Sequence, residues 1–251
     1  QRLYENHKVL TYPRTDSRYL SKDIVPTIKD RLEACGTGPY RKLAMTAKKK
    51  DLSGKLAFVN DAKVSDHHAI IPTEQFVDLS HMTNEERKIY DLVVRRFLAV
   101  LYPPFEYEQT QVKVKVGGET FLASGKIVKA QGWRAAYEEE VYSAEDEEEE
   151  EAYESGKSLK GQTLPELEKG QEIKGLVLSL TEGKTKPPAH FNEATLLSAM
   201  ENPTAYMESH DKAMAKTLGE TGGLGTVATR ADIIEKLFKS FLLEKRGKDI
   251  Y

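Results

Sequence analysis

The sequence of 251 residues predicts an α+β fold with more than one domain. Three observations predict it: helix-like spacing of apolar residues in the first hundred positions, apolar–polar alternation in the middle, and helix-like spacing again after Pro187-Pro188. Hydrophobic residues make up 39% of the chain, yet no apolar run approaches the ~20 residues of a membrane-spanning helix. Cys35 is the only cysteine, which excludes an internal disulfide and a cysteine-based zinc site. We therefore expect a cytoplasmic protein with no membrane partner.

The first section is predicted to be mainly helical. Residues 21–35 carry apolar side chains at near-helical spacing and are followed by a Gly-Thr-Gly-Pro breaker. Thr83 and Glu86 have the spacing of a capping box, in which each side chain binds the backbone of the other. After this box, one helix face is predicted to hold Ile89, Leu92, Val93, Phe97, Val100 and Leu101. Pro103-Pro104 should end that helix.

The middle section has the two-residue period of β-strands. Val112, Val114 and Val116 alternate with polar residues, and Gly117-Gly118 separates them from a second run at 119–124. Two glycines between alternating runs are typical of a hairpin, because its tight turn needs positive φ. Residues 164–180 also read as strand, interrupted by two glycines.

The last section predicts two more helices. Asn192 is placed to cap the first of them. A glycine-rich loop at 219–225 precedes Thr229 and Asp232, whose spacing predicts a second capping box. The helix that follows is expected to carry Ile233, Ile234, Leu237, Phe238 and Phe241.

The net charge of −3 hides an uneven distribution. Residues 138–154 contain eleven acidic and no basic side chains, so the rest of the chain sums to +8. The first 56 residues hold 13 basic and 6 acidic side chains. A basic section suits a polyanionic partner such as nucleic acid, although a solvated lysine-rich surface gives the same count. The acidic run is typical of a solvated loop.

The stretch TYPRTDSRYL at 11–20 contains the first chemically suggestive pair. Tyr12 and Arg14 lie two residues apart across the stiff Pro13, so a nucleophile and a cation could face one phosphate. A tyrosine with a pKa of ~10 needs positive neighbours that favour its phenolate. Arg14 could also stabilise charge on the phosphate oxygens. The same spacing is common on ordinary strands and turns.

Two further stretches are candidates for a nucleic-acid site. In DHHAIIPT at 66–73, His67 or His68 could hold or move a proton at a phosphodiester. Either could instead be a structural histidine of the loop. A metal site is disfavoured, because the two histidines lack Cys or carboxylate partners at the spacing that metal ligands need. The glycine-rich loop, with Thr229 and Arg230 at a helix start, could offer amides to a phosphate or be an ordinary connection.

Five stretches, in this order along the chain, resemble type IA DNA topoisomerases. They are TYPRTDSRYL, DHHAIIPT, SGKIVKAQGWRAAY, KTKPPAHFNEATLLSAME and GLGTVATRADIIEKL. The first and the last are more similar to the topoisomerase III branch than to topoisomerase I. The resemblance runs from end to end, which makes it more specific than any single motif.

The resemblance implies an enzyme that passes one DNA strand through another, without ATP. Tyr12 matches the nucleophile that becomes joined to the 5′ end of the broken strand. Arg14 matches the arginine that positions this tyrosine and stabilises the transition state. His67 matches the family's histidine, and Asp16 is placed to orient it.

The resemblance also implies partners and an arrangement of domains. The expected partner is DNA, preferably single-stranded, and a helicase is a further expected partner. The residues expected to bind DNA are Arg18, Thr226, Thr229 and Arg230. Residues 1–95 resemble a tyrosine-bearing domain related to winged-helix proteins. Residues 96–186 resemble part of a β-rich arch, here with the acidic loop 138–154. Residues 187–251 resemble part of a helical domain that grips single-stranded DNA.

The family's metal site has no counterpart in the sequence. Type IA enzymes hold Mg²⁺ with an Asp-x-Asp pair in a Toprim domain that precedes the tyrosine, whereas only eleven residues precede Tyr12. We therefore expect Mg²⁺ to bind outside this chain, no metal site within it, and no activity of the chain alone. The alternative is a DNA-binding module that has lost the chemistry. A tyrosine recombinase is disfavoured, because its tyrosine follows its arginines and histidine.

Overall fold

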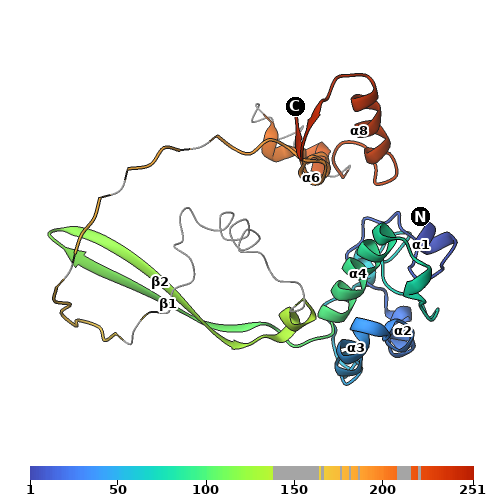
Figure 1. The fold of residues 1–251 in the computed structure, drawn as a ribbon, viewed down its shortest axis with the longest axis horizontal. Coiled ribbons are helices and arrows are strands. Elements are labelled where there is room, and N and C mark those ends of the chain that lie inside the picture. Colours follow the sequence, from blue (N-terminus) through green and yellow to red (C-terminus); the bar gives the residue numbers. More distant parts are fainter. Residues whose placement is uncertain are drawn as a thin grey trace. The chain divides into compact units, whose positions relative to one another are not determined.

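The computed structural model divides into two compact units, Gln1–Ile173 and Lys174–Tyr251, which are described separately (Figure 1). The described residues are 1–137, 164, 167–175, 177–180, 182–185, 187–207, 216–219 and 222–251. The acidic loop expected at 138–154 lies outside them. The mixed α and β composition predicted from the sequence is confirmed.

The first unit begins with a helical body. Its α-helices are α1 (Arg2–Glu5), α2 (Ile28–Cys35), α3 (Arg41–Ala47) and α4 (Asn84–Ala99). Short 3₁₀ turns lie at Lys22–Thr27, Gly38–Tyr40, Asp61–Lys63, Leu79–His81 and Gly132–Ala136. The helix expected over 21–35 is α-helical only from Ile28, because Pro26 cannot donate a backbone hydrogen bond and the turn before it is 3₁₀.

Helix α4 supplies the centre of the core. Tyr90, Val94 and Leu98 are at most 1% exposed and pack in one cluster with Ile28 and Leu32 of α2. The predicted apolar face was partly wrong, since Ile89 and Leu92 are 52% and 61% exposed. The buried stripe is rotated by one residue, and Tyr90 belongs to it because its ring is large enough to fill the space beside α2.

The predicted capping box at the start of α4 is confirmed. The Glu86 backbone N–H donates to Thr83 Oγ1 at 3.2 Å, and the Thr83 backbone N–H donates to Glu86 Oε2 at 2.8 Å. Glu86 also pairs with Arg2 at 2.9 Å and with His7 at 3.3 Å. The hydrogen bond from the Thr83 amide, together with Arg2 and His7, lowers the pKa of Glu86. These contacts fix α1 and the chain after it against the first turn of α4.

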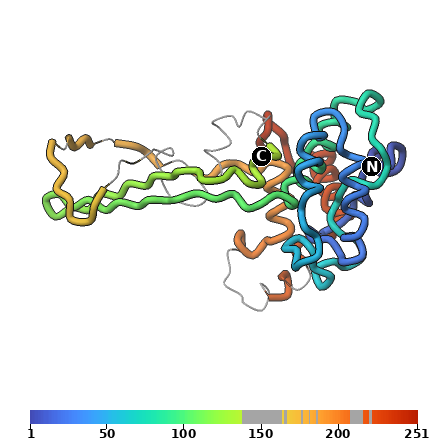
Figure 2. Tube along the Cα trace, turned by 90° about the horizontal axis from the view of Figure 1, so that it is seen from below, coloured from blue at the N-terminus to red at the C-terminus, as the bar shows by residue number. Residues whose placement is uncertain are grey.

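The predicted hairpin is also confirmed. Strands β1 (Glu106–Val116) and β2 (Glu119–Ala130) pair antiparallel and leave the helical body as a long two-stranded ribbon (Figure 2). Gly117 and Gly118 take φ values of 56° and 90°, as a tight hairpin turn requires. At the base of the ribbon, Arg95 of α4 donates to the Ala136 carbonyl at 2.7 Å. The ribbon is thereby tied to the helical core.

The strand expected over 164–180 does not form in the described part of that segment. Val177 and Leu180 are 92% and 94% exposed. Apolar–polar alternation makes a stable strand only beside a partner edge that accepts its hydrogen bonds and covers its apolar face. The described residues place no such edge beside this segment.

The second unit contains α6 (Glu193–Glu201), α8 (Arg230–Lys239) and a small antiparallel pair, β3 (Lys245–Arg246) with β4 (Asp249–Ile250). The Asn192 cap of α6 is confirmed by the Thr195 backbone N–H, which donates to Asn192 Oδ1 at 2.9 Å. The capping box predicted at Thr229 is wrong, since this side chain makes no cap hydrogen bond. Phe241 was expected on α8 but lies beyond it, 95% exposed.

The three expected domains remain a prediction. The expected boundary at residues 95 and 96 falls inside α4, and the division into compact units falls at residues 173 and 174. Across the described ranges, we find no helix with the length and apolar character needed to cross a bilayer.

Candidate active site

The tyrosine and histidine stretches meet through antiparallel pairing of two segments far apart in the sequence. The Thr11 backbone N–H donates to the Ile71 carbonyl, and the Thr73 backbone N–H donates to the Val9 carbonyl, both at 3.0 Å. Leu10 lies opposite Pro72 between them. Because Val9, Leu10 and Ile71 are at most 5% exposed, burial holds this pairing in register.

Tyr12 and His67 lie side by side at the end of this pairing. Their ring centroids are 4.4 Å apart, with the planes inclined by 41°. The edge of the Tyr4 ring, from α1, packs against Tyr12 at 5.4 Å. His67 is exposed, whereas His68 is half-buried with its Nδ1 2.7 Å from the Ala69 carbonyl. Of the two histidines, the structure therefore places His67 beside the candidate nucleophile.

Tyrosines in the core are unsuited to nucleophilic chemistry. Burial raises the pKa of Tyr90 and of Tyr40, and the Tyr40 hydroxyl also donates to Asp91 at 2.8 Å. Tyr12 is only half-buried and lies at the surface. Among these three phenols, Tyr12 is the one that a bound ligand can reach.

Small polar residues fix the loop after Tyr12, whereas its charged residues make no contact that holds the loop. Thr15 Oγ1 donates to the His67 carbonyl at 2.9 Å, and Ser17 Oγ donates to the Lys63 carbonyl at 2.8 Å. Arg14, Asp16 and Arg18 are exposed and make no hydrogen bond or ion pair with any described residue. The expected orienting contact from Asp16 to His67 is therefore not formed in this structure, while both arginines are available to a phosphate.

Arg31 supports the site and carried no signal in the sequence. It is 7% exposed on α2 and donates from Nη1 to the Pro72 carbonyl at 2.8 Å. Its other nitrogens contact Thr27 Oγ1 and Glu74 Oε1, each at 2.8 Å. Burial lowers the pKa of Arg31, although Glu74 offsets part of this effect. The guanidinium fixes the segment that pairs with the tyrosine stretch.

Replacing Arg31 by Met should lower the free energy of unfolding of the chain by about 1–3 kcal/mol, because the buried Pro72 carbonyl loses its donor. Urea unfolding measures the loss. Lys29→Met is the matched control, since Lys29 is exposed on the same helix and its loss should change little. Equal effects of the two substitutions would contradict the proposed support.

The glycine-rich loop of the second unit is organised around Arg230. This side chain is 8% exposed, and it donates to the carbonyls of Leu224 at 3.0 Å, Gly225 at 3.3 Å and Gly222. Gly223 packs so closely on the end of α6 that an added Cβ would lie 2.2 Å from the Met200 carbonyl oxygen. The guanidinium of Arg230 therefore holds the loop together in this structure.

Thr226 and Thr229 bind one another at the start of α8. Their hydroxyls are 3.0 Å apart, and the Thr226 backbone N–H donates to Thr229 Oγ1 at 3.0 Å. Both residues are exposed. Of the residues expected to bind DNA in this unit, these two present their hydroxyls at the surface, whereas Arg230 is directed into the loop.

Replacing Arg230 by Met should unfold the glycine-rich loop and lower the stability of the second unit by about 1.5–3 kcal/mol. Hydrogen exchange of the amides at 222–225 should accelerate markedly. Arg230→Lys keeps the charge but cannot span several carbonyls, so an intermediate effect is expected. Lys236→Met, an exposed position on α8, serves as the control. Unchanged exchange in Arg230→Met would refute this role.

Within the described ranges, no group of three or more His, Cys, Asp or Glu side chains is arranged to hold a metal ion. The described residues therefore do not fit a Mg²⁺ site.

Comparisons with known proteins cover the whole chain. A family model described as DNA topoisomerase matches residues 1–251. The chain is 59% identical to DNA topoisomerase 3 of Bacillus licheniformis, 58% to that of Bacillus subtilis and 59% to that of Bacillus anthracis. Each alignment includes 100% of the chain and 33% of the relative. The chain therefore spans about a third of the length of the curated relatives it matches.

Proposed function

Because this chain belongs to the DNA topoisomerase family, as a segment of a type IA topoisomerase III, we propose that it supplies the nucleophile's side of the active site in a longer enzyme. That enzyme cleaves one DNA strand, passes DNA through the break and rejoins the ends. The observation that carries the proposal is the contact between Tyr12 and His67, whose ring centroids are 4.4 Å apart. Arg14 follows Tyr12 by two residues and is unpaired within the described structure.

The reaction exchanges one phosphate ester for another. The Tyr12 hydroxyl oxygen attacks a backbone phosphorus, a bond forms between them, and the bond from phosphorus to the 3′ oxygen breaks. The 3′ oxygen leaves with a proton, and the 5′ end stays joined to Tyr12. Attack by the 3′ hydroxyl reverses both bonds. Since the ester is conserved, rejoining needs no ATP.

Each of three residues near Tyr12 has a proposed role in this reaction. His67 is proposed to accept the phenolic proton of Tyr12; the 4.4 Å between their ring centroids and the exposure of His67 support this role. Arg14 is proposed to bind the phosphate oxygens on which charge gathers, a role supported by its exposure and by its lack of an ion pair with any described residue. Asp16 is exposed two residues further on, and we propose that it turns toward His67 once a phosphate occupies the site.

The DNA path is proposed to be single-stranded near Tyr12. Arg18 is exposed in the same loop as Arg14 and can bind a neighbouring phosphate. The exposed hydroxyls of Thr226 and Thr229 supply polar contacts in the second unit, where Arg230 holds their loop in place. A helicase that opens duplex DNA would supply the single strand.

We propose that the Mg²⁺ site lies outside this chain, whereas the three domains lie within it. Mg²⁺ and its Toprim domain are proposed to belong to the longer protein, which acts on DNA at the nucleoid in the cytoplasm. The winged-helix-related domain, the β-rich arch and the helical gripping domain are proposed for residues 1–95, 96–186 and 187–251. The long ribbon of β1 and β2 supports the second of these assignments.

The test is to trap the adduct. The longer protein is incubated with a labelled single strand and Mg²⁺, denatured rapidly and digested, and the labelled peptide is identified by mass spectrometry. The proposal expects DNA on the peptide that contains Tyr12. DNA binding without any adduct would favour a binding module that has lost the chemistry. An adduct on another tyrosine would refute the assignment.

A further inference from the structure

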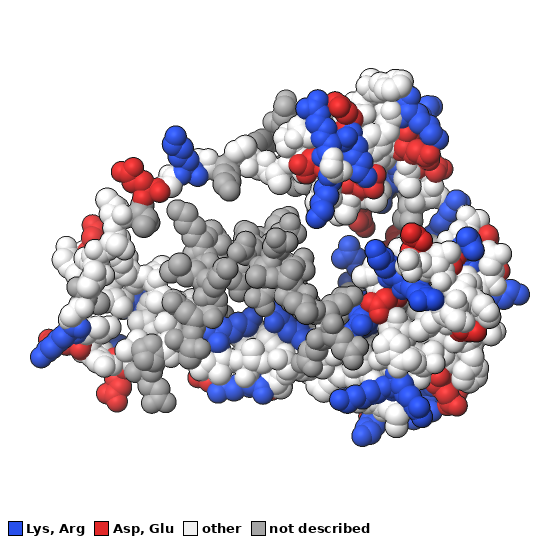
Figure 3. Space-filling view, viewed as in Figure 1, with Lys and Arg blue, Asp and Glu red and all other residues white. Residues whose placement is uncertain are grey.

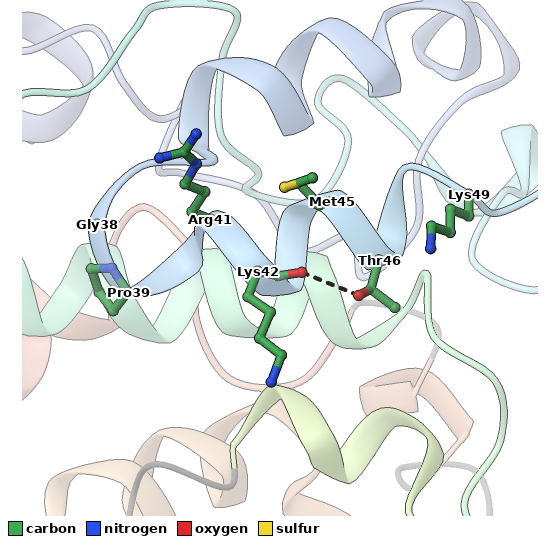
Figure 4. A pocket seen from close by; sticks show the side chains of 7 residues that line it. All are labelled: Gly38, Pro39, Arg41, Lys42, Met45, Thr46 and Lys49. Carbon is green, nitrogen blue, oxygen red and sulfur yellow. Dashed lines mark hydrogen bonds between the residues drawn. The ribbon is translucent and has the colours of Figure 1, made fainter.

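A depression of ≈ 540 Å³ lies on the outer face of α3 and is lined mainly by basic and aliphatic side chains (Figure 4). The lining residues are Gly38, Pro39, Arg41, Lys42, Met45, Thr46 and Lys49. Lys42 and Thr46 lie four residues apart on α3 and point to the same side, Lys49 follows just after the helix ends, and Arg41 extends in another direction (Figure 4). Three basic side chains therefore border one depression and are separated from one another.

These cations are not neutralised by neighbouring acids. Arg41, Lys42 and Lys49 are exposed and form no ion pair with any described residue. Lys48, by contrast, pairs with Glu33 at 2.8 Å. Lys and Arg side chains also gather at the lower edge of the space-filling view, where Figure 1 places α3 (Figure 3). The positive charge of these three side chains is therefore not neutralised by ion pairs with described residues.

This depression is separate from the Tyr12 site. Tyr4 of α1 packs on Tyr12, and Arg2 of the same helix pairs with Glu86 in the first turn of α4. At the other end of α4, the Tyr102 hydroxyl donates to the Leu43 carbonyl of α3 at 3.1 Å. The two ends of this helix are ~20 Å apart, from 1.5 Å per residue. One bound phosphate cannot contact both places.

The lining indicates the kind of ligand. No aromatic ring is among the lining residues, so an unstacked base of a single strand would find no stacking partner there. Several separated cations around one depression instead fit several phosphates, and duplex DNA carries the highest charge density, one charge per ~1.7 Å of its axis. We propose that the basic surface around this depression at α3, formed by Arg41, Lys42 and Lys49, binds the backbone of a duplex DNA segment distinct from the strand at Tyr12. This inference rests on the proposed function, which supplies DNA as the partner.

The experiment compares two triple variants of the full-length protein. The test variant carries Arg41→Ala, Lys42→Ala and Lys49→Ala. The matched control carries Arg87→Ala, Lys113→Ala and Lys115→Ala, which removes the same charges from exposed positions elsewhere in the first unit. Fluorescence anisotropy measures binding of a labelled duplex of ~30 base pairs over a range of salt concentrations, and adduct trapping measures cleavage of a short single strand. Thermal unfolding verifies that both variants fold.

The test variant should bind duplex at least tenfold more weakly than the control at low salt. The slope of log affinity against log salt should shrink by about two to three, because two to three phosphate contacts are lost. Single-strand cleavage should stay at the wild-type rate. Equal duplex affinity of the two variants would overturn the α3 proposal and leave the proposed function intact. Absence of an adduct in the wild type would refute the proposed function, while the duplex comparison would still decide the role of α3.

Discussion

Replacing Tyr12 by Phe in the longer protein should abolish the covalent DNA adduct and relaxation of supercoiled DNA. Phenylalanine preserves the ring that packs between His67 and Tyr4 but removes the only atom that can attack phosphorus. Folding and DNA binding should therefore survive while the chemistry is lost. Denaturing gels of a labelled single strand measure the adduct, and anisotropy measures binding to the same strand.

Two neighbouring tyrosines serve as matched controls. Tyr4→Phe retains the ring that packs on Tyr12, and Tyr19→Phe removes a hydroxyl that accepts a hydrogen bond from Lys63 at 3.3 Å. Both variants should form the adduct at near wild-type levels. An adduct that persists in Tyr12→Phe, or disappears in Tyr19→Phe, would show that another tyrosine is the nucleophile.

Replacing Arg14 by Ala should slow cleavage by about 10²–10³-fold, the usual effect of removing one transition-state donor. Arg14 makes no contact that stabilises the described structure, so its loss should leave thermal unfolding unchanged. The guanidinium is instead expected to act when negative charge develops on the phosphate oxygens. Single-turnover cleavage at saturating single strand isolates this effect from binding.

Arg18→Ala is the matched control for Arg14→Ala. Arg18 is equally exposed in the same loop, and its loss should weaken binding and reduce the salt dependence while leaving the cleavage rate at saturation nearly unchanged. His67→Ala should slow cleavage less than Arg14→Ala, because water can partly replace a group that accepts a proton. Similar cleavage rates in the Arg14 and Arg18 variants would contradict a transition-state role for Arg14.

The sequence predicted best those elements whose signals are local. The capping box of Thr83 and Glu86 and the turn at Gly117 depend on residues within a few positions of one another, and both form as expected. Not every local signal succeeded, since the capping box predicted at Thr229 does not form. The other failures depend on distant contacts. The buried face of α4 depends on the side chains of α2 that pack against it. The strand predicted over residues 164–180 does not form, because no strand edge lies beside that segment in the described structure.

In the candidate site too, some features follow from the sequence and others only from the tertiary structure. The sequence by itself determined the chemical groups, because Tyr12, Arg14 and the two histidines lie in short stretches that resemble a known family. Only the tertiary structure decided that Arg230 is turned into its own loop. It also shows that His67, which the resemblance had singled out, adjoins Tyr12, whereas His68 does not. The position of His67 beside Tyr12 comes from the pairing of residues 9–11 with 71–73, which is held by burial of Leu10 and by the bond from Arg31 to the Pro72 carbonyl. Such contacts join positions about 40 to 60 residues apart, and no local pattern encodes which of them will form, because their free energy arises only when the core is packed.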